Sequence, residues 1–217
     1  SDRDNNMSAS TAPAASVSLP PLPTALYATL KGHEGPVYAV RWNNNGTYCV
    51  TGSEDKTVKL WNPHKGLLIK TYRNHGYQVL DMDIDRDNSR FVSCGGDRVV
   101  FLWDVTTGNT MRRMRGHTSR VNCVKYNMEC SVVVSGGYDK TIRFWDMRSR
   151  STEPIQTLEH CKDSVSSLDV TDTEIIAASI DGTVRMFDMR TGKCVKDDLH
   201  EAVTSVQLSN DKNCLLA

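Results

Sequence analysis

The chain has no long apolar run. No stretch approaches the roughly 20 consecutive apolar residues of a membrane-spanning helix, and the first residues lack the basic start and hydrophobic run of a secretion signal. Net charge is also missing, because 26 basic residues balance 26 acidic ones. The global field that draws proteins onto nucleic acid or acidic membranes is therefore absent. We expect neither a membrane partner nor a direct nucleic-acid partner.

Cysteine pairs at metal-ligand or redox spacing are missing too. The seven cysteines include no C-x-x-C pair, and most lie in apolar runs, where a thiol behaves as a small hydrophobe. This usage favours a reducing compartment, the cytoplasm or the nucleus. His64 and His200 have no cysteine or histidine at ligand spacing, and no nucleotide-binding, hydrolase or metalloprotease motif occurs. We expect no metal, no cofactor and no small-molecule substrate.

A 42-residue repeat organises the remainder of the chain. Trp61, Trp103, Trp145 and Phe187 stand at this spacing, and each closes a unit of short β-rich runs separated by turn clusters. A period of this length, opened by Gly-His and closed by Trp-Asp, is typical of four-stranded β-propeller blades. The sequence predicts an all-β propeller with four complete blades and part of a fifth.

Strand positions follow from the same pattern. In the first unit we expect strands at 36–42, 48–53, 57–61 and 67–72, and the third unit ends with one at 155–158. A fourth unit spans about 164–199 and a fifth begins at Ala202. Residues 1–24 are rich in Ser, Ala and Pro and are expected to form a disordered tail before a propeller domain at 25–217. Leu19–Pro23 is either a stiff linker or a short polyproline ligand.

In each of the first three units the sequence predicts one buried hydrogen-bond network of polar side chains. The histidine of Gly-His bonds to an aspartate in the turn between the second and third strands, and a Ser or Thr hydroxyl links that histidine to the tryptophan N–H. Such a set also resembles a Ser-His-Asp catalytic constellation, but three copies at one spacing favour a structural role. We therefore predict no enzyme and keep a hydrolase as the alternative. The predicted sets are His33, Thr51, Asp55 and Trp61; His75, Ser93, Asp97 and Trp103; and His117, Ser135, Asp139 and Trp145.

The fourth unit departs from this scheme. His160 is one position out of step, Ala177 replaces the hydroxyl and Phe187 replaces the indole, which leaves Asp181 without its predicted partners. We expect this blade to be held mainly by apolar packing and to open first.

Gly116-His117 and Trp145-Asp146, repeated as above, resemble the WD-repeat β-propeller family over residues 26–217. Residues 61–81, 144–158 and 163–170 further resemble WD-repeat scaffolds that organise mitogen-activated protein kinase cascades. The resemblance implies a seven-bladed, non-catalytic scaffold that binds kinase-cascade components and also occurs in the spliceosome, where pre-mRNA splicing takes place. It also implies that the ring closes through a strand at 26–31. Because the sequence contains only four units and a fragment of a fifth, we expect either a truncated sequence or an open arc.

The resemblance places protein binding on the face where the first strands begin. Hot spots of the family flank the valine of the first strand and precede the turn aspartate. These positions carry Pro36, Tyr38 and Glu54; Gln78, Leu80 and Gly96; Arg120, Asn122 and Tyr138; and Ser164, Ser166 and Ile180. Tyr38, Arg120 and Tyr138 are the principal candidates, because aromatic residues and Arg dominate interface energetics.

A second binding function is suggested by a W-D-x-R box. Trp145, Asp146 and Arg148 match it, and Asp188 and Arg190 repeat its later positions after Phe187. This box resembles the one through which some WD-repeat proteins dock to the adaptor of a cullin-type ubiquitin ligase. The alternative function is therefore that of a substrate receptor, although an arginine here also simply pairs with an acid.

Overall fold

Each of the four complete repeats folds into one four-stranded antiparallel sheet. The computed structural model describes residues 25–209 and 214–217. In each sheet the strands follow one another in chain order, so each is a simple meander. The strands are β1 (Val37–Trp42), β2 (Cys49–Ser53), β3 (Thr57–Asn62) and β4 (Leu67–Arg73); β5 (Val79–Ile84), β6 (Arg90–Gly95), β7 (Val99–Asp104) and β8 (Thr110–Arg115); β9 (Val121–Tyr126), β10 (Val132–Gly137), β11 (Ile142–Asp146) and β12 (Gln156–Leu158); and β13 (Val165–Val170), β14 (Glu174–Ser179), β15 (Thr183–Asp188) and β16 (Cys194–Asp198).

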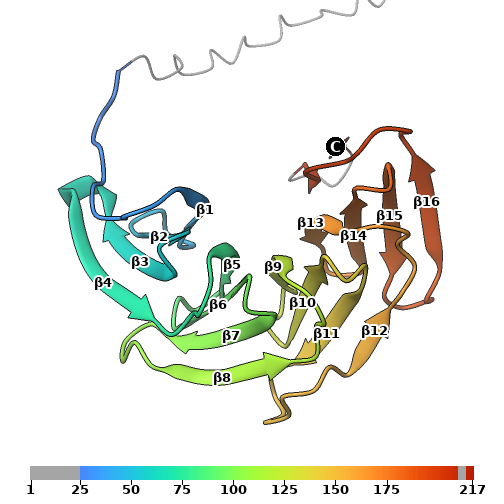
Figure 1. Ribbon diagram of the computed structural model, residues 1–217, viewed down its shortest axis with the longest axis horizontal. Coiled ribbons are helices and arrows are strands. Elements are labelled where there is room, and N and C mark those ends of the chain that lie inside the picture. The colour runs from blue at the N-terminus through green and yellow to red at the C-terminus, as the bar shows by residue number, and fades with distance from the viewer. Residues whose placement is uncertain (1–24, 210–213) are drawn as a thin grey trace, which may run out of the picture.

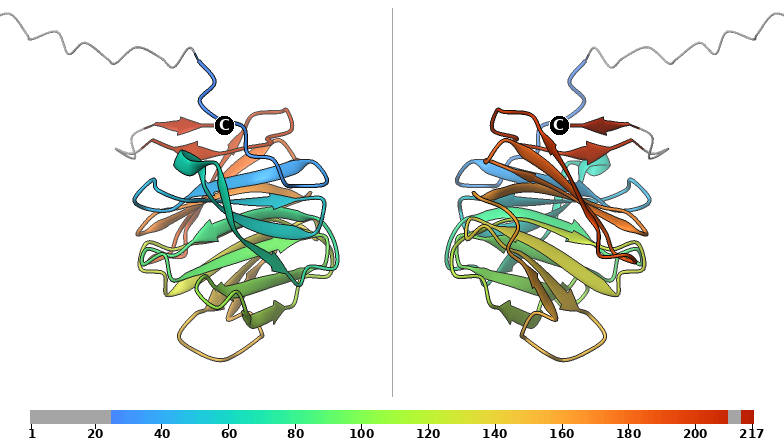
Figure 2. Two further views of the ribbon diagram at one scale, coloured as in Figure 1. Left: turned by 90° about the vertical axis from the view of Figure 1, so that its left-hand side faces the viewer. Right: turned by 90° about the vertical axis from the view of Figure 1, so that its right-hand side faces the viewer.

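The four sheets are arranged as the blades of an open arc. Figure 1 shows the first strands β1, β5, β9 and β13 toward the centre and the fourth strands β4, β8, β12 and β16 on the outer rim. A two-stranded sheet, β17 (Gln207–Leu208) and β18 (Leu215–Leu216), follows the fourth blade. The side views show the blades stacked face to face, with their hairpin turns along the two sides of the stack (Figure 2). This arrangement is the predicted all-β propeller.

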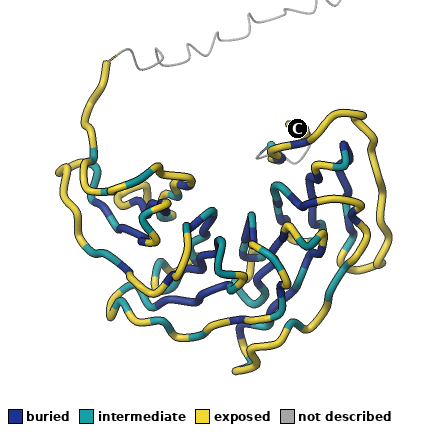
Figure 3. The backbone as a smooth tube through the Cα atoms, viewed as in Figure 1, coloured by how far each residue is buried: buried dark blue, intermediate teal, exposed yellow. Residues whose placement is uncertain are grey.

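Hydrophobic clusters join neighbouring blades, and a further one packs the fourth blade against Val203 and Val206. Val58 and Tyr72 of the first blade pack with Phe91 and Trp103 of the second, and similar clusters join the second blade to the third and the third to the fourth. Burial is therefore concentrated in the middle strands, whereas the rim strands are largely exposed (Figure 3). A single blade leaves an apolar face open, so neighbouring blades stabilise one another.

Carboxylates on the first strands also connect the blades. Asp81 and Asp83 of β5 accept hydrogen bonds from the backbone N–H groups of Val124 and Tyr126 on β9, at 3.1 and 2.8 Å. Asp169 of β13 accepts one from Leu208 on β17 at 2.8 Å. Burial raises the pKa of Asp81 above its ordinary value, although Arg41 and the Val124 N–H oppose that rise.

The observed strands lie close to the predicted ones. The strand expected at 36–42 is observed at Val37–Trp42, and the strand expected at 155–158 is observed at Gln156–Leu158. Residues 26–31, which the resemblance assigns to ring closure, are not part of a described sheet, and their pairing with a closing blade stays a prediction. The predicted tail at 1–24, with Leu19–Pro23, lies outside the described residues. Among the described residues, no helix has the length and apolarity needed to cross a bilayer.

Candidate protein-docking site

The first three blades each contain the predicted polar chain. His33 Nδ1 lies 2.7 Å from Asp55 Oδ2, and its Nε2 lies 2.7 Å from Thr51 Oγ1. The second and third blades repeat this geometry, with histidine-to-hydroxyl distances of 2.7 and 2.8 Å. The indole N–H of Trp61, Trp103 and Trp145 donates to the same hydroxyl at 2.8, 2.8 and 2.9 Å. Each chain fastens the second and third strands to the segment before the first strand.

Two of the turn aspartates at the end of these networks, Asp139 and Asp55, have pKa values below the ordinary value. Burial alone would raise the pKa of Asp139, but hydrogen bonds from His117, the Thr118 N–H and Thr141 outweigh it and hold the pKa well below its ordinary value. The pKa of Asp55 is lowered in the same way, against burial, by Thr57, His33 and the Glu34 N–H.

The geometry does not offer Ser135 to a substrate. Its side chain is fully buried, and its oxygen is shared between His117 and Trp145. A nucleophile must be exposed beside donors for an oxyanion. The Ser-His-Asp geometry is therefore that of a structural network.

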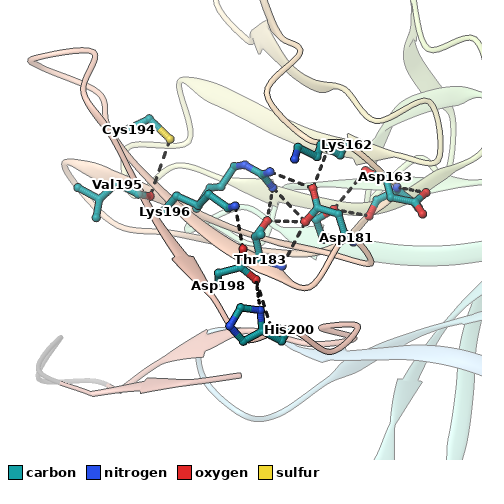
Figure 4. Close-up of polar contacts among 12 residues, drawn as sticks. Lys162, Asp163, Asp181, Thr183, Cys194, Val195, Lys196, Asp198 and His200 are labelled. Carbon is teal, nitrogen blue, oxygen red and sulfur yellow. Dashed lines mark hydrogen bonds and ion pairs between the residues drawn. The ribbon is translucent and has the colours of Figure 1, made fainter.

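The fourth blade holds its turn aspartate with a guanidinium. Arg185 Nη2 lies 2.9 Å from Asp181 Oδ2. The Lys162 N–H donates to the same oxygen at 2.8 Å (Figure 4). Thr183 also bonds to Asp181. The prediction that Asp181 is left alone is therefore wrong. His160 instead packs edge-on against Phe187, with ring centroids 5.6 Å apart.

Every first strand carries a β-bulge at the same place. In each blade the register skips one residue near the start of the strand, so that this residue has no cross-strand partner. Bulges re-aim a side chain and recur next to functional sites. The four unpaired residues are Tyr38, Leu80, Asn122 and Ser166, which are all among the predicted binding positions.

A backbone hydrogen bond repeated in every blade joins the predicted position before the first strand to the predicted position before the turn aspartate. The residue before each turn aspartate donates its backbone N–H to the carbonyl of the residue before the first strand. Every blade therefore brings its predicted positions together at one end of the sheet. The bonds are Glu54 to Pro36 at 2.9 Å, Gly96 to Gln78 at 3.0 Å, Tyr138 to Arg120 at 2.9 Å and Ile180 to Ser164 at 3.0 Å.

Two of these clusters present exposed aromatic side chains. Tyr38 is half-exposed and its hydroxyl donates to Glu54 at 3.1 Å, a bond that raises the pKa of Tyr38. The guanidinium of Arg120 lies 4.7 Å from the ring centroid of Tyr138. These contacts fix the orientation of large side chains, which lowers the entropy that a partner must remove on binding.

Three predicted positions are occupied by contacts between blades. The amide of Asn122 donates to Ser164 Oγ and to the Val165 carbonyl, at 2.8 and 2.7 Å. Ser164 is buried, and Ser166 donates to the Val203 carbonyl. The third and fourth blades therefore present fewer free polar groups on this face than the sequence predicts.

The W-D-x-R residues lie at the opposite end of the third strand from the turn aspartate. Trp145 is buried within its hydrogen-bond chain, whereas Arg148 is 77% exposed and lies 3.8 Å from Glu129. The carboxylates of Asp146 and Asp188 cap their own turns, since they accept the N–H groups of Arg148 and Arg190 at 2.8 Å. The pKa of Asp188 is lowered by hydrogen bonds from the Thr191 and Arg190 N–H groups.

Metal-ligand groups do not gather in the part of the chain that the structure describes. No three His, Cys, Asp or Glu side chains are arranged to hold an ion there. His64 lies 3.2 Å from the Gly46 carbonyl, and His200 lies 3.3 Å from Asp198.

Comparison with known families agrees with this geometry. The model of the WD domain, G-beta repeat family matches residues 24–62, 66–104, 108–146 and 152–188, which is most of the chain. The chain belongs to this WD-repeat family. Proteins of the family generally mediate protein–protein interactions and are not enzymes.

Curated relatives match a shorter part of this WD-repeat chain. WD repeat domain-containing protein 83 of Xenopus tropicalis is 53% identical over 78 residues, 36% of this chain and 25% of the relative. The Homo sapiens protein of the same name is 50% identical over 74 residues, 34% of this chain and 24% of the relative. The Dictyostelium discoideum homologue is 42% identical over 65 residues, 30% and 20% respectively. The matched stretches therefore span a quarter or less of these relatives.

Tyr77 is a further exposed aromatic residue on this face of the WD-repeat chain, at a position that the repeat pattern does not single out. Tyr77 is 60% exposed, and a Cβ built at Gly96 would lie 2.9 Å from the Tyr77 Cβ. In the second blade the turn position is glycine, so the neighbouring Tyr77 covers it instead. In the sequence, this role of Tyr77 is indicated by the glycine at position 96 together with the aromatic residue directly before Gln78.

Proposed function

We propose that this chain is a non-catalytic scaffold that docks partner proteins on its bulge face. The bulge face comprises Pro36, Tyr38, Glu54, Tyr77, Gln78, Leu80, Arg120 and Tyr138, with Ile180 at its fourth-blade end. The observation that carries the proposal is the bulge repeated in every first strand beside a turn held by one backbone hydrogen bond. Function on a rigid, repeated edge is typical of radial sheets.

The energetics of this face favour two anchor points. Aromatic side chains and Arg contribute most to binding when they are held in place before the partner arrives. Tyr38 with Glu54 forms one such group, and Arg120 with Tyr138 forms the other. They lie on the first and third blades, so a partner that contacts both must cross the second blade.

We further propose partners from mitogen-activated protein kinase cascades and from the splicing machinery, in the cytoplasm and the nucleus. The support is the resemblance of residues 61–81, 144–158 and 163–170 to the mitogen-activated protein kinase organizer. Seven free cysteines agree with a reducing compartment. The balanced charge favours proteins over nucleic acid or membrane as partners.

The decisive experiment is a pull-down with a Tyr38→Ala plus Arg120→Glu variant. We expect the variant to stay folded, because both residues are exposed, and to lose kinase-cascade and splicing proteins that the wild-type chain captures from cell extract. An Arg86→Glu variant, whose exposed arginine lies in the turn between β5 and β6 outside the bulge face, is the matched control. Full retention of these partners by the folded double variant would refute the bulge face.

The second candidate function is that of a substrate receptor of a cullin-type ubiquitin ligase. It is favoured by the exposure of Arg148 just beyond the buried Trp145, at the end opposite the bulge face. Arg148→Ala is expected to abolish co-purification of the ligase adaptor while leaving the bulge-face partners bound. Unchanged adaptor capture would rule this function out.

A further inference from the structure

Four arginines surround a hollow on the outer rim between the second and third blades. Its volume is about 850 Å³, and its lining includes Arg112, Arg113, Arg115 and Arg150 but no carboxylate and no aromatic ring. None of the ion pairs between described residues involves any of these arginines. The chain as a whole is neutral, so this concentration of positive charge is local.

Two of the arginines shape the hollow. Arg112 donates to the backbone carbonyls of Asp146 and Met147 at 2.8 and 3.1 Å and thereby holds the loop after β11 beside β8. Arg113 donates to Asn74 at 2.7 Å and lies over the ring of Phe101. These contacts use part of each guanidinium and fix its position.

The other two arginines have no such role. The side chains of Arg115 and Arg150 are exposed, and no hydrogen bond from either guanidinium to a described residue is present. A guanidinium offers five N–H donors in a planar fork that matches two oxygens of a phosphate or carboxylate. Arg115 and Arg150 therefore supply unused donors around the same space.

The hollow also borders an open sheet edge. β8 is the last strand of its sheet, so its outer side has no strand neighbour (Figure 1). The Arg115 N–H bonds outward to the Thr152 carbonyl at 2.9 Å, so the chain's own loop after β11 pairs with the C-terminal end of this edge. By the two-residue alternation of an antiparallel ladder, the main chain of Arg113 also faces outward.

We infer that this rim hollow binds an extended peptide that carries a phosphorylated side chain. The peptide adds its main chain to the edge of β8, and its phosphate takes bidentate hydrogen bonds from Arg115 and Arg150. Single-stranded nucleic acid fits less well, because its bases require exposed aromatic rings for stacking and the lining has none. The site is separate from the bulge face, which lies at one end of the blades and not on the rim.

The test uses a degenerate octapeptide library with a fixed central phosphoserine, beside the same library with serine. We expect phosphate-dependent binding by the wild-type chain and at least a tenfold loss of affinity in an Arg115→Glu plus Arg150→Glu variant. An Arg86→Glu plus Lys193→Glu variant makes the same change in charge at exposed positions elsewhere and should bind as the wild type does.

Three results would overturn the inference. They are equal capture of both libraries, equal affinity of the rim and control variants, and preferential binding of an octanucleotide RNA that competes with the peptides. The Tyr38→Ala plus Arg120→Glu variant should keep the phosphopeptide while it loses the bulge-face partners. Failure of one site is therefore distinguishable from failure of the other.

Discussion

The third and fourth blades hold the same turn aspartate with different donors. In the third blade His117 contacts Asp139 at 3.0 Å, and Arg143, four residues after the aspartate, is half-buried and donates to Thr141. In the fourth blade Arg185 stands at the equivalent position, is buried, and takes the place of the histidine at Asp181. Ala177 and Phe187 have removed the hydroxyl and the indole that would hold an imidazole there.

The difference teaches that the turn requires a donor and not a particular side chain. Both aspartates also accept the N–H of their own hairpin turn, from Thr141 and Thr183. A buried carboxylate without partners is costly, so any well-placed cation or N–H can stabilise it. The blade geometry persists, because the strand register at Phe187 matches that at Trp145.

The largest effect is expected from removing the guanidinium in the fourth blade. Arg185→Met leaves Asp181 buried without its charged partner, and we expect a loss of about 3–5 kcal/mol in the free energy of unfolding, measured with urea. The matched Arg143→Met variant keeps His117 on Asp139 and should lose no more than about 1 kcal/mol. Equal losses in the two variants would show that the two blades are anchored alike.

The hydroxyl of the second strand gives the next largest contrast. Ser135→Ala removes the group shared by His117 and Trp145 and should cost about 1–3 kcal/mol. The reverse change, Ala177→Ser, places a hydroxyl beside Phe187 in a fully buried site without an indole donor, so we expect it to destabilise the chain rather than to stabilise it. A stabilised Ala177→Ser variant, measured in the same urea titration, would break the comparison.

Lowering the pH should weaken the stabilisation by Asp139 and by Asp181 in the same way. The pKa values of Asp139 and Asp181 lie below the ordinary value near 4, so the folded chain binds these protons less readily than the unfolded chain. Their stabilisation is complete above that pH and is lost as the pH falls below it, by up to about 1.4 kcal/mol per pH unit for each carboxylate.

Urea unfolding between pH 7 and pH 2.5 measures this loss. Asp139→Asn and Asp181→Asn should each flatten the acid limb by a similar amount. A change of slope in only one variant would show that the two carboxylates are not equivalent.

The smallest expected effect concerns which blade opens first, as measured by amide exchange. The expectation that the fourth blade opens first rested in part on an unpartnered Asp181, whereas Arg185 now anchors it. We therefore expect amide exchange in residues 165–190 to be only slightly faster than in the first blade, and Arg185→Met to widen that difference. Slower exchange there than in the first blade would contradict the predicted order.

Much of the fold could be predicted because it is periodic. The spacing of Trp61, Trp103 and Trp145 and of their histidines fixed the strand order and the polar chains of three blades. Arg185 was missed because the repeat pattern assigns no role to the fourth residue after the turn aspartate, where Lys59 and Phe101 stand in other blades. The link from Asn122 to Ser164 was missed because it joins two repeats, and spacing within one repeat does not show it.

The sequence by itself determined the blade, because local alternation, turn residues and one polar set per repeat are encoded within 42 residues. Only the tertiary structure decided which side chains are free. Asn122, Ser164 and Ser166 are used between blades, whereas Tyr77, Arg115 and Arg150 are left exposed. The physical reason is that burial and hydrogen-bond satisfaction depend on the neighbouring blade, whose contacts arise from residues about 40 positions away.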